Sequence, residues 1–221
     1  MRHAPISDIA GIVLAAGAGS RLGAPKGLLR TACGQPVVAR LCDQLTAAGL
    51  AEIIVVTGAA AEAVAAGVPA GARIAHAPDW QDGLSASLRA GLRAVADAPA
   101  GERTCAVVIL LADIPDITAA AIELVIAAAR EQGVETSLVR AVFGQRPGHP
   151  VVIGSQHWQQ AIDTAAGDSG AKAVFASGTV CEVDCSHLCT GADIDTPAQL
   201  HAAGLWLPEL LPDARAGGEG R

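Results

Sequence analysis

The feature that most constrains how this chain can fold is a repeated alternation of short apolar runs with segments of helical periodicity. Four apolar runs have the length of buried strands, at residues 10–16, 52–58, 72–78 and 105–115. Four segments with helical spacing follow them, at residues 35–50, 59–68, 83–97 and 118–133, the last with Thr118 as its expected N-cap. This alternation predicts an α/β domain with a mostly parallel sheet, helices on both faces, and ligands at the carboxyl ends of the strands.

The alternation changes after Gly133. Short strands are predicted at 136–143 and 149–154, joined by the polar loop "GQRPG", and a helix at 155–166 and a strand at 179–185 follow. We expect these elements to extend the first half within a single domain, residues 1–212. The last residues, 213–221 ("DARAGGEGR"), have the composition of a disordered tail.

Composition and charge limit the partners that we expect. Apolar residues make up 51% of the chain but aromatic residues only 2%, so the core must consist of Val, Ile, Leu and Ala, as in buried parallel strands. A net charge of −7 and the lack of a Lys/Arg run disfavour a nucleic-acid partner. Since we find neither a membrane-spanning apolar stretch nor a signal peptide, we expect a cytoplasmic protein without a membrane partner.

A glycine-rich loop, "LAAGAGSRLGAPKGLL" (14–29), follows the first predicted strand and carries two cations, Arg21 and Lys26. Such a loop holds either the pyrophosphate of a bound dinucleotide or the triphosphate of a nucleotide that is to be cleaved. The dinucleotide fingerprint needs an acidic residue at the end of the second strand, where this chain has "VVTGAA". Two cations suit a pyrophosphate leaving group. An NAD(P)-dependent oxidoreductase is therefore the less favoured alternative.

Two carboxylates are candidates for a metal site. Asp113 follows the strongest apolar run, so it should lie at the carboxyl end of a central strand, where it can bind Mg²⁺ between phosphates. A second ligand must come from elsewhere, and "ADIDTP" offers Asp193 and Asp195. Asp116 is a better candidate for a structural role, in capping the turn after the strand.

Six cysteines fall into two groups. Cys33, Cys42 and Cys105 lie in apolar or helical contexts and are predicted to be buried thiols. The other three, Cys181, Cys185 and Cys189, are spaced C-x3-C-x3-C. Zinc sites usually have tighter pairs, and alternation along a strand also explains this spacing, so we disfavour a metal site there.

The loop "LAAGAGSRLGAPK" resembles the signature L-A-[AG]-G-x-[SG]-x-R-[ML]-G-x-[PD]-K of the nucleotidyltransferases related to molybdenum cofactor enzymes. Five further segments are similar to segments of that family: "DWQDGLSASLRAG" (79–91), "LLADIP" (110–115), "GQRPGHPVVIG" (144–154), "GDSGAK" (167–172) and "DIDTPAQL" (193–200). "LAAG" together with "PK" is similar to the cytidylyltransferase branch, whereas the guanylyltransferase branch more often has "LAGG" with "DK". The resemblance implies a Rossmann-like, three-layer nucleotidyltransferase fold.

The resemblance also implies a role for each matching residue. Catalysis falls to Arg21, Lys26 and Asp113, and Mg²⁺ binding to Asp113 and Asp195. Nucleotide binding falls to Leu14, Ala15, Ala16, Gly17, Gly19, Ser20, Arg21, Lys26, Gly83 and Ser87. Acceptor binding falls to His149, Gly170 and Lys172. From their place in a glycine loop, we expect Arg21 and Lys26 to be exposed when no ligand is bound.

The implied reaction is the Mg²⁺-dependent transfer of CMP from CTP to the phosphate of molybdopterin, with release of pyrophosphate. A molybdoenzyme or its chaperone is the implied protein partner. Two alternatives keep the fold and change the substrates: GTP as the donor, or a phosphorylated sugar, polyol or lactate as the acceptor. A cofactor chaperone without catalytic activity is disfavoured, because Lys26, Asp113 and Asp195 are all present.

Overall fold

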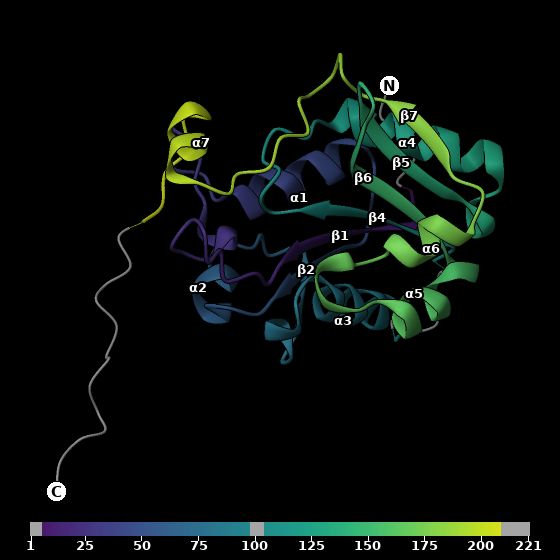
Figure 1. Cartoon of the computed structure of the whole chain (residues 1–221), viewed down its shortest axis with the longest axis horizontal. Coiled ribbons are helices and arrows are strands. Elements are labelled where there is room, and N and C mark those ends of the chain that lie inside the picture. Colours follow the sequence, from purple (N-terminus) through teal and green to yellow (C-terminus); the bar gives the residue numbers. More distant parts are fainter. Residues whose placement is uncertain (1–5, 98–103, 209–221) are drawn as a thin grey trace, which may run out of the picture.

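A computed structural model describes residues 6–97 and 104–208, which build one seven-stranded sheet (Figure 1). The strands are β1 (Ile9–Ala15), β2 (Ile53–Thr57), β3 (Arg73–His76), β4 (Ala106–Leu111), β5 (Leu138–Phe143), β6 (Arg146–Gly154) and β7 (Cys181–Asp184). Their order across the sheet is β3-β2-β1-β4-β6-β5-β7. Only β6 runs antiparallel to its neighbours, β4 and β5, so the expected mostly parallel sheet is confirmed.

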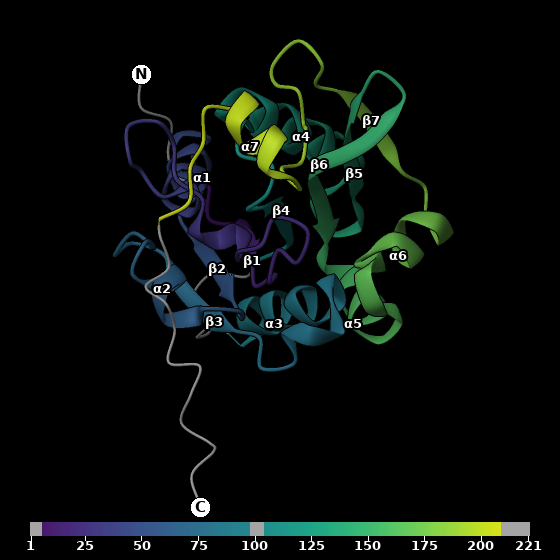
Figure 2. The same ribbon diagram turned by 60° about the vertical axis from the view of Figure 1, so that its left-hand side comes forward.

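Helices cover both faces of the sheet. They are α1 (Val37–Ala47), α2 (Ala61–Ala65), α3 (Leu84–Ala96), α4 (Ala119–Gln132), α5 (Trp158–Thr164), α6 (Lys172–Ser177) and α7 (Pro197–Ala202). Figures 1 and 2 show α1 and α4 on one side of the sheet and α3, α5 and α6 on the other. The expected three-layer α/β architecture is thus confirmed. No helix in the described ranges is long and apolar enough to cross a membrane.

The core is divided between the two faces by the alternation of side chains along each strand. In β1, Ile9 and Val13 pack against α1 and α4, whereas Ile12 and Leu14 pack against α3. The largest fully buried side chains are all Ile or Leu, so aliphatic packing fills this core, as the composition predicts. Strands that are buried on both faces hold the carboxyl ends of β1 and β4 next to each other, and the candidate site lies there.

Most predicted elements are present with small shifts of their ends, and Thr118 caps α4 by accepting a hydrogen bond from Ala121 N at 3.3 Å. The prediction of a "GQRPG" loop is wrong, because β6 already begins at Arg146. The turn between β5 and β6 has only two residues, Gly144 and Gln145. Gly144 adopts a φ of +65°, which glycine does without strain. Arg146 is held there by hydrogen bonds to the carbonyls of Thr190 and Gly191.

Other predictions differ from the structure in detail. The predicted helix at 155–166 is a 3₁₀ turn (Ser155–His157) followed by the shorter α5, and α6 was not predicted. Cys33, predicted to be buried, is exposed. The predicted tail at 213–221 lies outside the described residues, and the domain boundary at residue 212 stays a prediction.

Candidate active site

A pocket of about 460 Å³ opens where β1 and β4 end, as expected for a parallel α/β sheet. The glycine loop after β1 forms one wall, and the start of α3 forms another. The residues that line it are Leu14, Ala15, Ala16, Gly17, Ala18, Gly19, Ser20, Arg21, Lys26, Trp80, Gln81, Gly83, Leu84, Ser87, Leu111, Ala112, Asp113, Asp168 and Asp195. Every residue of the predicted nucleotide-binding and metal-binding sets is among them. We call this cavity the first pocket.

The glycine loop is a tight turn that its sequence makes possible. The N–H groups of Leu22 and Gly23 donate to the carbonyl of Gly19 at 3.0 and 2.8 Å. Gly19 has a φ of +61°, and a Cβ atom there would lie 2.0 Å from the carbonyl oxygen of Ala24. Only glycine fits this position. After the turn, the 3₁₀ segment Lys26–Leu28 directs Lys26 back towards the pocket.

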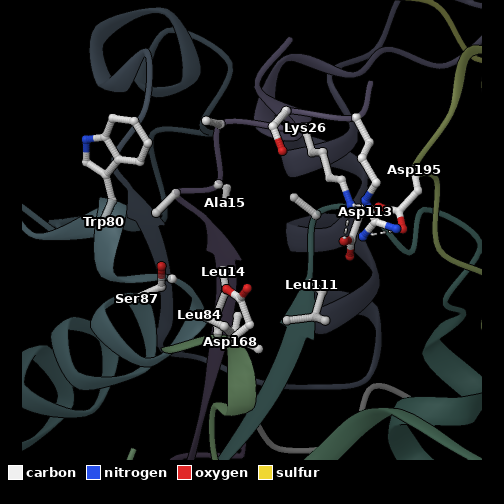
Figure 3. A pocket seen from close by; sticks show the side chains of 18 of the residues that line it. Leu14, Ala15, Lys26, Trp80, Leu84, Ser87, Leu111, Asp113, Asp168 and Asp195 are labelled. Carbon is white, nitrogen blue, oxygen red and sulfur yellow. Dashed lines mark hydrogen bonds and ion pairs between the residues drawn. The ribbon is translucent and has the colours of Figure 1, made fainter. Parts of the chain in front are cut away.

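Four charged side chains meet in the first pocket, and Figure 3 shows three of them, Lys26, Asp113 and Asp195, together on one side of the cavity. Lys26 Nζ lies 2.8 Å from Asp113 Oδ2 and also donates a hydrogen bond to Asp195 Oδ1. Arg21 forms an ion pair with Asp195 Oδ2 at 2.9 Å. The lysine therefore bridges two carboxylates that lie far apart in the sequence. We call these four residues the charged cluster.

The contacts within the charged cluster favour the ionised forms of Lys26 and Asp195. The hydrogen bond from Lys26 lowers the pKa of Asp195 and outweighs burial, with help from the positive charges of Lys26 and Arg21. Burial by itself would lower the pKa of Lys26, but attraction and hydrogen bonds from Asp113 and Asp195 raise it above its usual value. The side chain of Lys26 is 18% exposed and that of Arg21 is 75% exposed. The expectation of exposure is thus correct for Arg21 and wrong for Lys26, because Asp195 reaches the lysine from a distant segment.

The two carboxylates fit a divalent cation. Asp113 Oδ1 is buried and has no hydrogen-bond partner within the described part of the chain. Asp113 and Asp195 both contact Lys26, so their carboxylates lie close to each other. Such a pair suits Mg²⁺, which usually takes one or two protein carboxylates and fills its other positions with water and phosphate oxygens. The ammonium group of Lys26 lies between the two carboxylates and supplies one positive charge there.

A clamp holds Asp195 in position. Asp116, on the same loop as Asp113, accepts hydrogen bonds from Thr190 N and Thr190 Oγ1 at 2.6 and 2.7 Å. Ile194 N donates to the carbonyl of Asp113 at 2.8 Å. The segment that ends in Asp195 is therefore tied at two points to the β4–α4 loop. Asp116 has a structural role, as expected, but it holds a distant segment instead of capping its own turn.

A second pocket, of about 570 Å³, adjoins the first. It includes all three predicted acceptor residues: His149 from β6, Gly170 before α6, and Lys172 at the start of α6. Much of the remaining lining is apolar, with Leu88, Ile109, Val151 and Phe175 among the wall residues. The two pockets share Leu14, Leu84 and Asp168 in their linings, so they meet beside the end of β1.

The charges in the second pocket are few. Desolvation lowers the pKa of His149 to about 4, against the attraction of Asp113, so the imidazole is neutral near neutral pH although part of it reaches solvent. Arg140, in the middle of β5, is paired with Glu182 through its Nε at 2.9 Å. Lys172 is exposed and is the remaining cation of the lining.

Several pocket residues were not predicted. Trp80, Gln81, Leu84, Leu111 and Asp168 line the first pocket, and Arg140 and Phe175 line the second. A signal existed for two of them: Trp80 is one of three tryptophans in the chain, and Arg140 interrupts an apolar strand. Leu84 and Leu111 carry no such signal, since an aliphatic residue is equally typical of the core.

The cysteines form no metal centre in the described ranges, where no group of three or more His, Cys, Asp and Glu residues is placed to hold an ion. Burial raises the pKa of Cys185 to about 11, so its thiol stays protonated. Cys181, Cys185 and Cys189 are all free thiols.

Comparison with known proteins agrees with this geometry. The structure of Rv0371c from Mycobacterium tuberculosis H37Rv is 27% identical, covering 90% of this chain and 98% of that chain with a TM-score of 0.70. A complex of Rv0371c with manganese is 25% identical over 89% and 97% of the two chains, with a TM-score of 0.68. A nucleotidyl transferase from Methanothermobacter thermautotroptrophicus shares the fold, at 22% identity, 88% and 94% coverage and a TM-score of 0.70.

The comparison with curated proteins gives no match. The family model described as the MobA-like NTP transferase domain matches residues 11–183, a range that contains the glycine loop and Asp113. With the α/β fold and the pocket at the ends of β1 and β4, this match shows that the chain is a nucleotidyltransferase of the MobA-like NTP transferase family.

Proposed function

We propose that this enzyme transfers CMP from CTP to the phosphate of a molybdopterin-type acceptor and releases pyrophosphate. The observation that carries the proposal is the charged cluster beside the glycine loop, with a second pocket adjoining it across Leu14 and Leu84. A nucleoside triphosphate in the first pocket would have its phosphates near Arg21, Lys26 and the two carboxylates. An acceptor in the second pocket would approach from the side of Asp168.

In this reaction the residues of the chain position the substrates and neutralise charge. An oxygen of the acceptor phosphate forms a bond to the α-phosphorus, while the bond from that phosphorus to the bridging oxygen of pyrophosphate breaks. Arg21 and Lys26 would stabilise the negative charge that develops on the leaving pyrophosphate. A phosphate nucleophile is already an anion, so no general base is needed.

Asp113 and Asp195 would hold Mg²⁺, with the orphaned Oδ1 of Asp113 as one ligand. When bound, the ion would polarise phosphate oxygens and offset their charge. The manganese complex of the similar Rv0371c structure supports a divalent ion. Lys26 would then exchange its carboxylate partners for phosphate oxygens.

The choice of acceptor rests on the lining of the second pocket. Sugar and polyol phosphates carry many hydroxyl groups, each of which needs a polar partner when it is buried. The apolar wall of Leu88, Ile109 and Phe175 instead favours an acceptor with a ring system. The choice of CTP rests on "LAAG" with "PK" in the loop, and GTP is the alternative donor.

A direct test is to measure pyrophosphate release from each of the four ribonucleoside triphosphates with purified molybdopterin and Mg²⁺. We expect release with CTP, at a rate that depends on the acceptor. Release with GTP alone would assign the enzyme to the guanylyl branch. If a sugar, polyol or lactate phosphate supported release and molybdopterin did not, that phosphate would be the acceptor. If no pair of nucleotide and acceptor gave release, the proposal would be contradicted.

A further inference from the structure

Lys26 and Asp195 come from segments that lie far apart in the sequence, and a second contact joins the residues that follow each of them. Arg30, shortly after Lys26, forms an antiparallel β-bridge with Trp206, which follows α7. Arg30 N donates to Trp206 O at 2.9 Å, and Trp206 N donates to Arg30 O at 3.0 Å. The two segments are therefore joined twice, once by the ion pair of the charged cluster and once by this bridge.

The side chains of Arg30 and Trp206 strengthen the bridge. The indole N–H of Trp206 donates to Thr31 O at 2.8 Å. The guanidinium carbon of Arg30 lies 5.8 Å from the centre of the Trp206 ring, a cation–π distance, and Arg30 Nη1 donates to Gly34 O at 2.8 Å. Trp206 is 42% exposed, so what its indole provides is this set of contacts and not a place in the core. We call the contact of Trp206 with Arg30 and Thr31 the latch.

Helix α7 connects the latch to Asp195. At the start of the helix, Gln199 Oε1 accepts hydrogen bonds from Asp195 N at 3.0 Å and from Thr196 Oγ1 at 2.9 Å. After its end, Leu205 N donates to Leu200 O at 3.1 Å, and both leucines are buried. The helix is therefore fixed to the backbone of Asp195 at one end and to the latch at the other.

The opposite side of the latch is fixed to Lys26. Leu29 N donates to the carbonyl of Lys26 at 3.1 Å, and Val37 N donates to the carbonyl of Leu29 at 2.8 Å. Leu28 and Leu29 are buried, so the backbone between Lys26 and Arg30 has little freedom. The latch therefore sets the separation of the two segments that bring a lysine and a carboxylate to the first pocket.

We infer that Trp206 is a positioning residue, which holds Asp195 at the proposed metal site through α7. The clamp at Asp116 fixes the segment before Asp195, and the latch fixes the segment after it. A carboxylate that is fixed on both sides keeps its orientation when Lys26 exchanges it for phosphate oxygens. Trp206 itself lines neither the first nor the second pocket. This inference rests on the proposed function and adds a residue that acts from outside the substrate pockets.

The first test is the affinity for Mn²⁺ without nucleotide, measured by calorimetry and by the electron paramagnetic resonance signal of the free ion. We expect Trp206→Ala to weaken Mn²⁺ binding about 10-fold, as is usual when a group that orients a metal ligand is removed. Trp206→Phe, which keeps a ring over Arg30 but loses the hydrogen bond to Thr31, should give an intermediate affinity.

Two further variants show whether the effect passes through Asp195. In an Asp195→Asn background, Trp206→Ala should change Mn²⁺ affinity less than about twofold, because the ligand that it positions is already lost. The matched control is Ile74→Ala on the edge strand β3, which removes an apolar side chain that is 50% exposed and should bind Mn²⁺ as the wild type does.

The second test needs no metal and follows the hydrogen exchange of backbone amides. In Trp206→Ala the amide of Asp195 should exchange about 10-fold faster, because its segment opens locally, while the amides of β1 keep the rates of the wild type. The inference would be overturned by wild-type Mn²⁺ affinity in Trp206→Ala, by unchanged exchange at Asp195, or by equal acceleration at all sites. If the wild type bound no Mn²⁺, the metal site of the proposed function would fail, and exchange at Asp195 alone would decide whether the latch positions this residue.

Discussion

The two adjoining pockets differ in how they are built and in what they offer a ligand. The first is organised around four charged side chains and a glycine loop, and nearly half of its lining residues come from one short stretch, residues 14–26. The second is largely apolar and takes its wall from β1, α3, β4, β5, β6 and α6. The difference indicates that one pocket works by neutralising charge and the other by excluding water from an organic surface.

Because of this difference, the lining of the first pocket says more about its ligand than the lining of the second pocket does. A phosphate chain needs a particular set of cations, backbone N–H groups and carboxylates, and few sequences provide it. An apolar wall accepts many ligands of the right size. The lining of the first pocket is therefore informative about chemistry, and that of the second pocket mainly about shape and polarity.

The largest effect should come from Asp113→Asn. Losing a carboxylate of the proposed metal site removes transition-state stabilisation, so we expect turnover to fall at least ~100-fold with the fold intact. Pyrophosphate release and the thermal unfolding temperature measure the two properties. The control is Asp163→Asn on α5, an exposed carboxylate that pairs with Gln159 and should be neutral. Turnover within about threefold of the wild type would remove Asp113 from the mechanism.

The next largest effect should be a difference in stability between variants of the two cations of the charged cluster, Lys26 and Arg21. Lys26→Ala leaves two partly buried carboxylates facing each other without a bridging charge, so it should lose activity and about 1–3 kcal/mol of stability. Arg21→Ala should lose activity but change stability by less than about 0.5 kcal/mol, as is usual for an exposed ion pair.

Urea unfolding measures the difference, with the exposed Arg93→Ala as a surface control. Adding Mg²⁺ or Mn²⁺ should restore part of the stability of Lys26→Ala, because the ion replaces the lost positive charge between the carboxylates. Equal stability of Lys26→Ala and the wild type without metal would show that the bridge contributes nothing to the fold.

Base preference should give a moderate effect within the first pocket. We expect CTP to bind more tightly than GTP by about 1–3 kcal/mol with Mg²⁺, because Ala16 lines the pocket and a glycine there would leave more room for a purine. Calorimetric titration of both nucleotides into the wild type and Ala16→Gly tests this. Ala16→Gly should reduce the difference in binding free energy between CTP and GTP. If the wild type bound GTP more tightly than CTP, the proposed donor would be GTP.

The smallest effect concerns the second pocket and pH. His149 has its pKa lowered to about 4, whereas the unfolded chain takes up the proton near pH 6.5, so the unfolded state binds more protons between these values. Stability contributed by neutral His149 is present above about pH 6.5 and is lost as the pH falls towards 4. Between about pH 7 and pH 5, the free energy of unfolding of His149→Asn should therefore fall by roughly 2 kcal/mol less than that of the wild type. Identical pH profiles in urea unfolding would show that His149 is not desolvated.

Much of the fold and of the first pocket is predictable because it depends on local pattern. Apolar runs and helical spacing locate the strands and helices to within a few residues, and the parallel arrangement brings Asp113 next to the glycine loop. The tight β5–β6 turn is a counterexample. Its polar sequence is typical of a longer loop, and Arg146 belongs to β6 because distant carbonyls at Thr190 and Gly191 hold it.

Trp80 and Lys26 are two residues of the first pocket whose surroundings cannot be predicted from the nearby sequence. The resemblance implies roles for Gly83 and Ser87 in the segment 79–91, and nothing local shows that Trp80 also lines the first pocket. Lys26 was expected to be exposed, since it lies in a glycine loop. It is 18% exposed because Asp195 reaches it across 169 positions of sequence.

The sequence by itself determined the alternation of strands and helices, the glycine loop with its two cations, and the residue types that the site contains. These features depend on residues that are only a few positions apart, and the local backbone geometry fixes how far apart such residues lie in space. Tertiary structure alone decided which two carboxylates Lys26 bridges, that His149 is neutral near neutral pH, and that Trp80 lies across the first pocket from Lys26. Ion pairs, burial and pKa values depend on distances between segments that are brought together only when the sheet is assembled.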